Sequence, residues 1–155
     1  IVYHPDSVRN LLLKSNGMAI TYDSLWIDLW KERFEDPLSD AETFQADDQG
    51  MLVSIGDKAN SITEIHGQYM GLLKFTPHAW QSIRGILDNM EEAIRDHLDM
   101  TSLLQHLLSV GYPIETIEIH GRWCEVDHGS DIELYERKII SKTGWSHDWR
   151  FDTNK

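Results

Sequence analysis

Hydrophobic positions recur along the chain with two different periods, and these periods predict alternating helices and strands. Apolar residues spaced three or four apart predict helices over residues 5–14, 24–34, 77–87, 101–110 and 131–139. Short alternating or continuous apolar runs between turn residues predict strands over 18–22, 42–46, 51–55, 67–75, 114–119 and 123–126. Helices that alternate with strands in this way indicate an α/β layered fold.

Turn and cap residues sharpen three of these boundaries. Thr76 followed by Pro77 predicts a helix start, because a capping hydroxyl precedes a proline at the first helical position. The run Asp-Asp-Gln-Gly at 47–50 predicts a hairpin between the strands on either side. Ser130 and Glu133 match the capping box, which predicts that the last helix begins at Asp131.

The length of 155 residues fits one domain, and a hydrophobic content of 41% is enough for a core. We expect the domain to occupy residues 1–140. The remaining segment, 141–155, is polar except for Trp145, Trp149 and Phe151. We expect this aromatic tail to pack on the body of the domain or on a partner.

The formal net charge of −12 changes the set of expected partners. DNA, RNA and anionic lipid each need a basic face, so we predict none of them as a partner. The charge suits a cationic ligand, or a phosphate ligand that arrives with a divalent metal; the alternative is that it serves solubility alone. No apolar run approaches the length of about 20 residues that spans a membrane, and no secretory signal opens the chain. A single cysteine, Cys124, excludes an internal disulfide, and we expect a reducing, cytoplasmic location.

Candidate chemistry lies in the stretch GRWCEVDHGSD at 121–131. If the strand over 123–126 is regular, alternation places Trp123, Glu125 and Asp127 on one side. Ligands of α/β sheets bind at the carboxyl ends of strands, where Asp127 could hold Mg²⁺. The alternative is that the carboxylate only favours the dipole of the following helix, and spacing alone supports that interpretation more strongly.

Four stretches carry a resemblance to a known family. Residues 1–5, 33–42, 67–75 and 123–127 resemble nucleotidyltransferases of the nucleotide-diphospho-sugar transferase superfamily, in the order that the family uses. The likeness is greatest to the choline-phosphate and aminoethylphosphonate cytidylyltransferase-like branch and covers residues 1–140. It implies the second half of that domain, with a mixed sheet and flanking helices.

In this family a phosphorylated alcohol or sugar attacks the α-phosphorus of a nucleoside triphosphate and releases pyrophosphate. Two aspartates hold Mg²⁺, and one of them matches Asp127. The other precedes the stretch that matches Ile1, as does the Gly-rich loop that cradles the triphosphate, and this sequence contains neither. The resemblance therefore implies a truncated, acceptor-side domain with an incomplete metal site that is not catalytic alone. We expect it to form a homo-oligomer that covers the sheet edge left open.

The resemblance also implies which residues bind the phosphorylated acceptor: Gln68, Tyr69, Trp123 and Glu125, with Gly71 allowing close approach to the backbone. The Tyr69 and Trp123 rings could attract a quaternary ammonium group by cation–π interaction. A core position for Trp123, and a bulge or tight strand packing at Gly71, are the alternatives.

Asp40 and Glu42 lie two residues apart before a predicted strand. They could orient an acceptor amine or hydroxyl, although a solvated pair is the stronger interpretation. At the level of the whole chain, the competing function is a non-catalytic or oligomer-forming module that binds a small cationic ligand or a protein partner.

Overall fold

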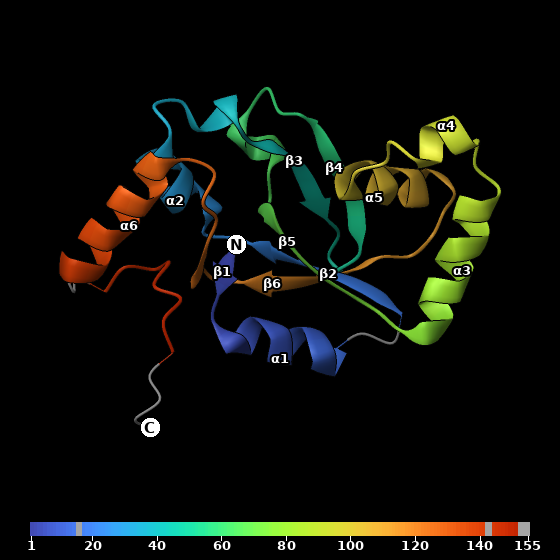
Figure 1. The fold of residues 1–155 in the computed structure, drawn as a ribbon, viewed down its shortest axis with the longest axis horizontal. Coiled ribbons are helices and arrows are strands. Elements are labelled where there is room, and N and C mark those ends of the chain that lie inside the picture. The colour runs from blue at the N-terminus through green and yellow to red at the C-terminus, as the bar shows by residue number, and fades with distance from the viewer. Residues whose placement is uncertain (15–16, 142–143, 152–155) are drawn as a thin grey trace.

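The computed structural model describes residues 1–14, 17–141 and 144–151 (Figure 1). Its centre is a three-stranded sheet in the order β5 (Gln68–Phe75), β2 (Met18–Asp23), β6 (Glu115–Ile119). Strand β2 runs antiparallel to β5 and parallel to β6. The predicted α/β class, with a mixed sheet and flanking helices, is confirmed.

Alternation along β2 explains why the sheet has two covered faces. Met18 and Ile20 point into a core cluster shared with the hairpin and two helices, while Ala19 packs with Leu11 and Ile117. The first face is covered by the hairpin of β3 (Glu42–Ala46) and β4 (Leu52–Lys58) and by α5 (Met100–Ser109). Helix α1 (Pro5–Lys14) covers the second face, as Figure 1 shows. The antiparallel pairing of β3 with β4 confirms the predicted hairpin.

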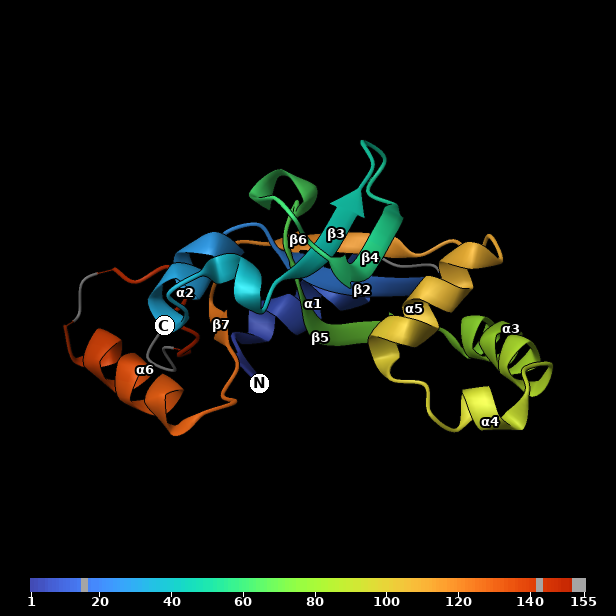
Figure 2. The ribbon, with the colours of Figure 1, turned by 90° about the horizontal axis from the view of Figure 1, so that it is seen from above.

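A further core cluster lies at one end of the molecule. It gathers α2 (Trp26–Arg33), β7 (Trp123–Cys124) and α6 (Gly129–Ser141), which Figure 2 shows together at the end opposite α3 (Pro77–Asp88) and α4 (Glu92–Arg95). Trp145 and Trp149 pack against this cluster. The short strand β1 (Val2–Tyr3) pairs with β7. Two turns of 3₁₀ helix, η1 (Pro37–Ser39) and η2 (Ile62–Glu64), complete the elements. Within the described ranges, no helix has the length and apolar character needed to cross a bilayer.

The predicted strand over 51–55 ends too early, because β4 continues to Lys58. Two further wrong boundaries concern the turn that carries the candidate chemistry. Strand β7 ends at Cys124 instead of 126, so Glu125 and Asp127 lie in the turn before α6 and strand alternation does not orient them. Helix α6 begins at Gly129, so Ser130 does not cap it. The side chain of Asp131 instead accepts hydrogen bonds from the backbone amides of Asp127 and His128 in the preceding turn. In a capping box, by contrast, the Ser130 side chain would accept from the Glu133 amide.

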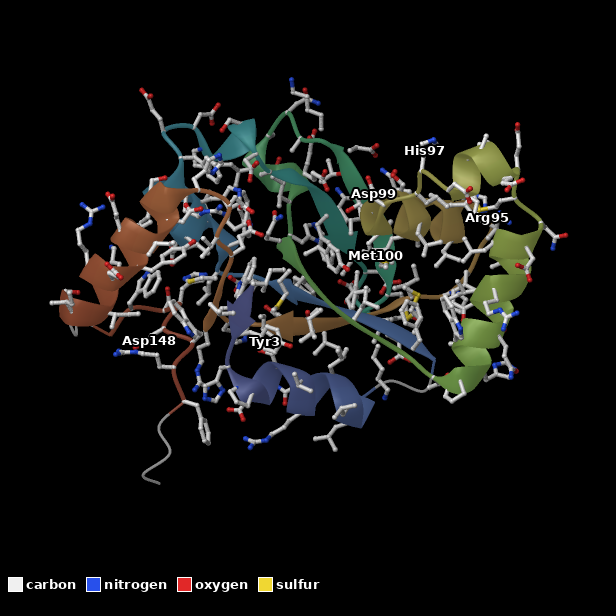
Figure 3. The ribbon with its side chains drawn as sticks, viewed as in Figure 1. Tyr3, Arg95, His97, Asp99, Met100 and Asp148 are labelled. Atoms are coloured by element: carbon white, nitrogen blue, oxygen red, sulfur yellow. The ribbon has the colours of Figure 1, made fainter. Side chains whose placement is uncertain are left out.

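Helix starts elsewhere follow ordinary capping chemistry. The Thr76 side chain accepts a hydrogen bond from the Ala79 amide, as predicted for the start of α3. Asp99 caps α5 through the Ser102 amide, at 2.7 Å, and lies at the start of that helix in Figure 3. The cap places the first turn of α5, including Thr101, at the border of the cavity described next.

Candidate functional site

Four of the six predicted site residues line one cavity of about 330 Å³: Gln68, Tyr69, Glu125 and Asp127. The remaining lining residues are Asp40, Glu42, Thr43, Phe44, Ile55 and Thr101. Gln68 and Tyr69 pair with Asp23 and Tyr22, so the cavity lies near the carboxyl end of β2. This is the end at which ligands of α/β sheets bind.

Carboxylates dominate the electrostatics of this cavity. Burial raises the pKa of Glu125, and the charges of Asp127 and Asp40 raise it further, against the opposing effect of Arg33. Burial also raises the pKa values of Asp40 and Glu42, and carboxylates near each of them add to the effect. Since these acids disfavour one another's ionised forms, a cationic group in the cavity would relieve the repulsion. We refer to it below as the acidic cavity.

Arg33, at the end of α2, joins the acids on one side of the acidic cavity. Its side chain is 1% exposed, and its Nη1 donates to Glu125 Oε1 at 2.7 Å while its Nη2 donates to Asp127 Oδ2 at 2.6 Å. The guanidinium carbon also lies 5.2 Å from the centre of the Trp30 ring and 4.9 Å from that of Phe34. Burial opposes the charged form, yet hydrogen bonds to the carboxylates raise the pKa of Arg33 above its ordinary value. The guanidinium is therefore a permanent positive charge beside the acidic cavity.

Asp131 fixes the turn that carries Glu125 and Asp127. It accepts from Arg33 Nε at 3.1 Å and from the backbone amides of Asp127 and His128, each at 3.0 Å. Burial raises the pKa of Asp131, but the hydrogen bonds outweigh it and the net pKa is lowered. Tyr135 donates its hydroxyl to the Glu125 carbonyl oxygen at 2.7 Å. The turn is thus held at its backbone as well as through its side chains.

Two predicted site residues lie outside the acidic cavity. Trp123 is fully buried in the core, where its Nε1 donates to Asp23 Oδ2 at 2.9 Å, so it is not available for a cation–π contact with a ligand. Gly71 has φ +76° and lies in a bulge, where β5 has three residues opposite Thr21 alone. A Cβ added at Gly71 would approach Ile1 instead of a ligand.

Tyr69 contributes its ring to the cavity and carries an unusual hydroxyl. The oxygen is buried and has no hydrogen-bond partner within the described residues. Burial raises the pKa of Tyr69 to about 12, so the phenol is protonated at neutral pH. A buried hydroxyl without a partner costs free energy, which a polar neighbour would recover.

The metal chemistry expected at Asp127 rests on few ligands. No group of three or more His, Cys, Asp or Glu side chains is arranged to hold a metal ion within residues 1–14, 17–141 and 144–151. Asp127 Oδ2 is already bonded to Arg33, which leaves Oδ1 for another ligand. A single hard oxygen fits Mg²⁺ that arrives with phosphate ligands of its own, because such ions are commonly bound through one or two carboxylates.

Arg33 and Asp131 hold the carboxylates of this site in place, and sequence reasoning gave neither of them that role. Arg33 begins the stretch 33–42 that carries the family resemblance, which was the available signal. Its contacts with Glu125, Asp127 and Asp131 span 92, 94 and 98 residues, a separation over which hydrophobic periodicity gives no information.

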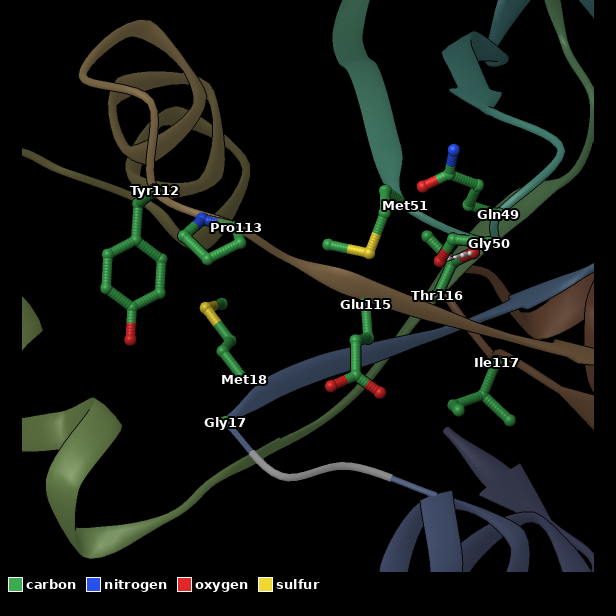
Figure 4. A pocket seen from close by; sticks show the side chains of 10 residues that line it. All are labelled: Gly17, Met18, Gln49, Gly50, Met51, Tyr112, Pro113, Glu115, Thr116 and Ile117. Carbon is green, nitrogen blue, oxygen red and sulfur yellow. Dashed lines mark hydrogen bonds between the residues drawn. The ribbon is translucent and has the colours of Figure 1, made fainter.

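A larger cavity, of about 540 Å³, lies at the amino ends of β2 and β6 (Figure 4). Met18, Met51, Tyr112 and Glu115 border it, and it contains none of the predicted site residues. Size alone therefore does not identify the site: the convergence of charged and polar groups favours the smaller, acidic cavity.

Comparison with known proteins gives both relatives and a structural neighbour, although no family model matches the sequence. The chain is 35% identical over 144 residues to CTP:phosphoglutamine cytidylyltransferase of Campylobacter jejuni, covering 89% of this chain and 56% of the relative. It is 26% identical over 96 residues to glucose-1-phosphate thymidylyltransferase of Streptomyces antibioticus, covering 62% of this chain and 26% of the relative. A solved structure of CMP:2-keto-3-deoxy-manno-octonic acid synthetase complexed with CTP matches at a TM-score of 0.56 and 14% identity, covering 89% of this chain and 57% of that one.

The chain thus spans little more than half the length of the first of these relatives and about a quarter of the second. The structural neighbour, at 14% identity, shows the fold. The two sequence relatives confirm the predicted resemblance at the level of the superfamily. The chain is homologous to nucleotidyltransferases and has the mixed α/β fold of a nucleotide-sugar-transferase-like domain.

Proposed function

We propose that the chain provides the acceptor side of a nucleotidyltransferase site, for a phosphorylated amino alcohol or sugar, and that it binds a phosphorylated amino alcohol in the acidic cavity. The observation that carries this proposal is the convergence of four carboxylates, from Asp40, Glu42, Glu125 and Asp127, with the amide of Gln68. Carboxylates attract an ammonium group, and the amide can donate to or accept from a polar group. The relative from Campylobacter jejuni is named for phosphoglutamine, whose amino-acid portion carries such an ammonium group.

We propose Mg²⁺ as the companion of the nucleotide and Asp127 as the residue that would hold it. When bound, the ion would neutralise phosphate charge. Arg33 keeps the Asp127 carboxylate in place, and Gln68 and Glu125 orient the acceptor. One carboxylate oxygen holds Mg²⁺ only loosely, so we expect the ion to bind together with a nucleoside triphosphate and not alone.

We further propose that the chain does not catalyse transfer alone. The sequence contains no Gly-rich phosphate loop of the kind the family uses, and nothing else in it is an evident grip for a triphosphate. Pyrophosphate release from CTP with choline phosphate and Mg²⁺ should therefore stay at background. Release above background that Asp127→Asn abolishes would instead establish a complete enzyme.

Calorimetry tests the proposed ligand class. Choline phosphate should bind the chain in the absence of nucleotide, whereas CTP with Mg²⁺ should bind only weakly. Asp40→Asn and Glu42→Gln each remove one charge from the acidic cavity and should weaken choline phosphate binding by about fivefold to tenfold, that is, by about 1 kcal/mol or more. Glu115→Gln, in the other cavity, serves as the control and should leave the affinity unchanged. An equal loss in all three variants would point to net charge instead of a defined site.

A second candidate function is self-association, and exposed apolar side chains favour it. Ile1, Leu12 and Leu13 are 61%, 62% and 83% exposed. Strand β5 pairs with β2 alone in its sheet, so its other edge has no strand partner within the described residues. We propose that copies of the chain associate through such surfaces. We also propose a cytoplasmic location, since the single cysteine, Cys124, is free and buried.

A further inference from the structure

The position of Arg33 is unusual for two reasons: its charged side chain is buried, and the proposed ligand carries a charge of the same sign. It is a buried cation beside a cavity that, on the proposed function, receives another cation. Its Nε, Nη1 and Nη2 donate to Asp131, Glu125 and Asp127, at 3.1, 2.7 and 2.6 Å. A second bond runs from Nη2 to Asp131 Oδ2 at 3.2 Å. All three guanidinium nitrogens are therefore bonded to carboxylates from the turn before α6 and from the first turn of that helix.

Two of the four carboxylates that line the acidic cavity, those of Glu125 and Asp127, each use one oxygen for Arg33. Glu125 gives Oε1 and Asp127 gives Oδ2, and no hydrogen bond joins Glu125 Oε2 or Asp127 Oδ1 to another described residue. The Asp127 side chain is 54% exposed and that of Glu125 is 21% exposed, while Arg33 is 1% exposed. The arginine thus lies behind the carboxylates, and their second oxygens remain for a ligand.

We propose that Arg33 is a positioning residue of the acidic cavity, which clamps one oxygen each of Glu125 and Asp127 and thereby presents the other oxygen of each to the cationic group of the ligand. This inference rests on the proposed function. The planar guanidinium has donors in a fixed fork, so it can hold several carboxylates in one geometry. The faces of Trp30 and Phe34 keep the fork from turning. A lysine would supply the charge but not the geometry.

A neighbouring ion pair provides a matched control. Lys138 on α6 pairs with Glu32 on α2 at 2.5 Å, so it joins the same two helices one residue away from Arg33. Neither Lys138 nor Glu32 borders the acidic cavity. If Arg33 only tied α2 to α6, loss of either pair would act on ligand binding in the same way.

The test measures binding of choline phosphate by calorimetry for the wild type, Arg33→Lys, Arg33→Gln and Lys138→Met. Circular dichroism and urea unfolding establish that each variant is folded under the conditions of the titration. We expect Arg33→Gln to lose about tenfold or more in affinity and Arg33→Lys to lose a similar amount, because an ammonium cannot replace the fork. Lys138→Met should remain within about twofold of the wild type, as expected for an ion pair near the surface.

Three outcomes would overturn the inference: wild-type affinity in folded Arg33→Lys and Arg33→Gln, full recovery of affinity in Arg33→Lys, or an equal loss in Lys138→Met. Should Arg33→Gln fail to fold, Arg33→Lys together with Asp131→Asn decides the matter. The second variant loosens the clamp and keeps the arginine. It should weaken binding, and unchanged affinity would contradict the clamp.

Nuclear magnetic resonance of the arginine side chain separates this inference from the proposed function. A clamped guanidinium rotates slowly, so the Arg33 Nη hydrogens should give separate signals, and these signals should shift when choline phosphate is added. If the wild type binds no choline phosphate, the proposed function fails. Separate Nη signals would then still support the clamp, whereas averaged signals would overturn it.

Discussion

Asp23 is a fully buried carboxylate that connects the end of β2 with the tail of the chain. Its Oδ1 accepts from the amides of Leu25 and Gly121, at 3.0 and 2.7 Å. Its Oδ2 accepts from Trp123 Nε1 at 2.9 Å and lies 2.8 Å from His147 Nε2. Burial raises the pKa of Asp23, but the hydrogen bonds from His147, Gly121 and Trp123 outweigh it and the net pKa is lowered.

Because the pKa of Asp23 is lowered in the folded chain, part of the free energy of unfolding should depend on pH in the acid range. The pKa of an aspartate in the unfolded chain is about 3.9, and the folded pKa of Asp23 lies below that value. Ionised Asp23 therefore stabilises the fold fully at pH values above the unfolded pKa, and the contribution is lost as the pH falls through the folded pKa. Urea unfolding at pH 7, 5 and 3 should show a fall in the free energy of unfolding between the last two values.

Asp23→Asn should remove that part of the fall, because the amide does not titrate. It should also lower the free energy of unfolding at pH 7 by about 1–3 kcal/mol, since an amide group cannot accept from all the donors that surround Asp23. Asp48→Asn, in the exposed hairpin loop, is the control and should leave both quantities unchanged. A pH profile of Asp23→Asn that matches the wild type would contradict this account.

At the scale of elements, two glycines predict opposite responses to the same substitution. A Cβ at Gly67, just before β5, would collide with the Tyr22 ring and with the Asp23 carbonyl, whereas one at Gly85 in α3 meets nothing within 4 Å. Gly67→Ala should therefore destabilise by about 1–3 kcal/mol, as overpacking does. Gly85→Ala should stabilise by about 0.5–1 kcal/mol, because alanine favours the helix.

Chemical denaturation of the two glycine variants measures this difference directly. The sign of the effect is the test: if Gly67→Ala is neutral or stabilising, β5 does not approach β2 as closely as described. Since Gln68 and Tyr69 follow Gly67 directly, the variant should also weaken binding of choline phosphate to the acidic cavity.

Most elements could be predicted from periodicity and caps, and the failure at the candidate site has a physical cause. Helix α3 follows from Thr76 and Pro77, and the hairpin follows from the turn at 47–50, because these signals are local. The turn at 125–131 was predicted wrongly because its geometry depends on Arg33, which lies more than 90 residues earlier. A capping box and a carboxylate clamp look alike in sequence, and the distant partner decides between them.

The residues of the candidate site also divide into those that the sequence could place and those that it could not. Gln68, Tyr69, Glu125 and Asp127 could be placed in one cavity from the family resemblance. Trp123 could not be assigned from sequence, since an indole at a strand end suits a pocket or a core equally. Its hydrogen bond to Asp23, across 100 residues, holds it in the core.

At the scale of the whole molecule, the proposed self-association predicts a measurable mass. Size-exclusion chromatography with light scattering should give a mass above the 18.0 kDa of one chain, because association would cover exposed apolar side chains and an unpaired strand edge. Leu13→Lys places a charge on α1 at a position that is 83% exposed, so it should shift the distribution toward the monomer. A single 18.0 kDa species for the wild type at all concentrations would contradict the proposal.

The sequence distance between Arg33 and its three acids has a consequence for folding. Contacts across 92–98 residues require closure of a long loop before they gain any energy, and such contacts form slowly. During synthesis the contacts between Arg33 and its three acids cannot form until residue 131 has left the ribosome. Competence to bind ligand should therefore arise as one of the last events in maturation, and recovery of choline phosphate binding after dilution from urea should lag behind recovery of helical signal.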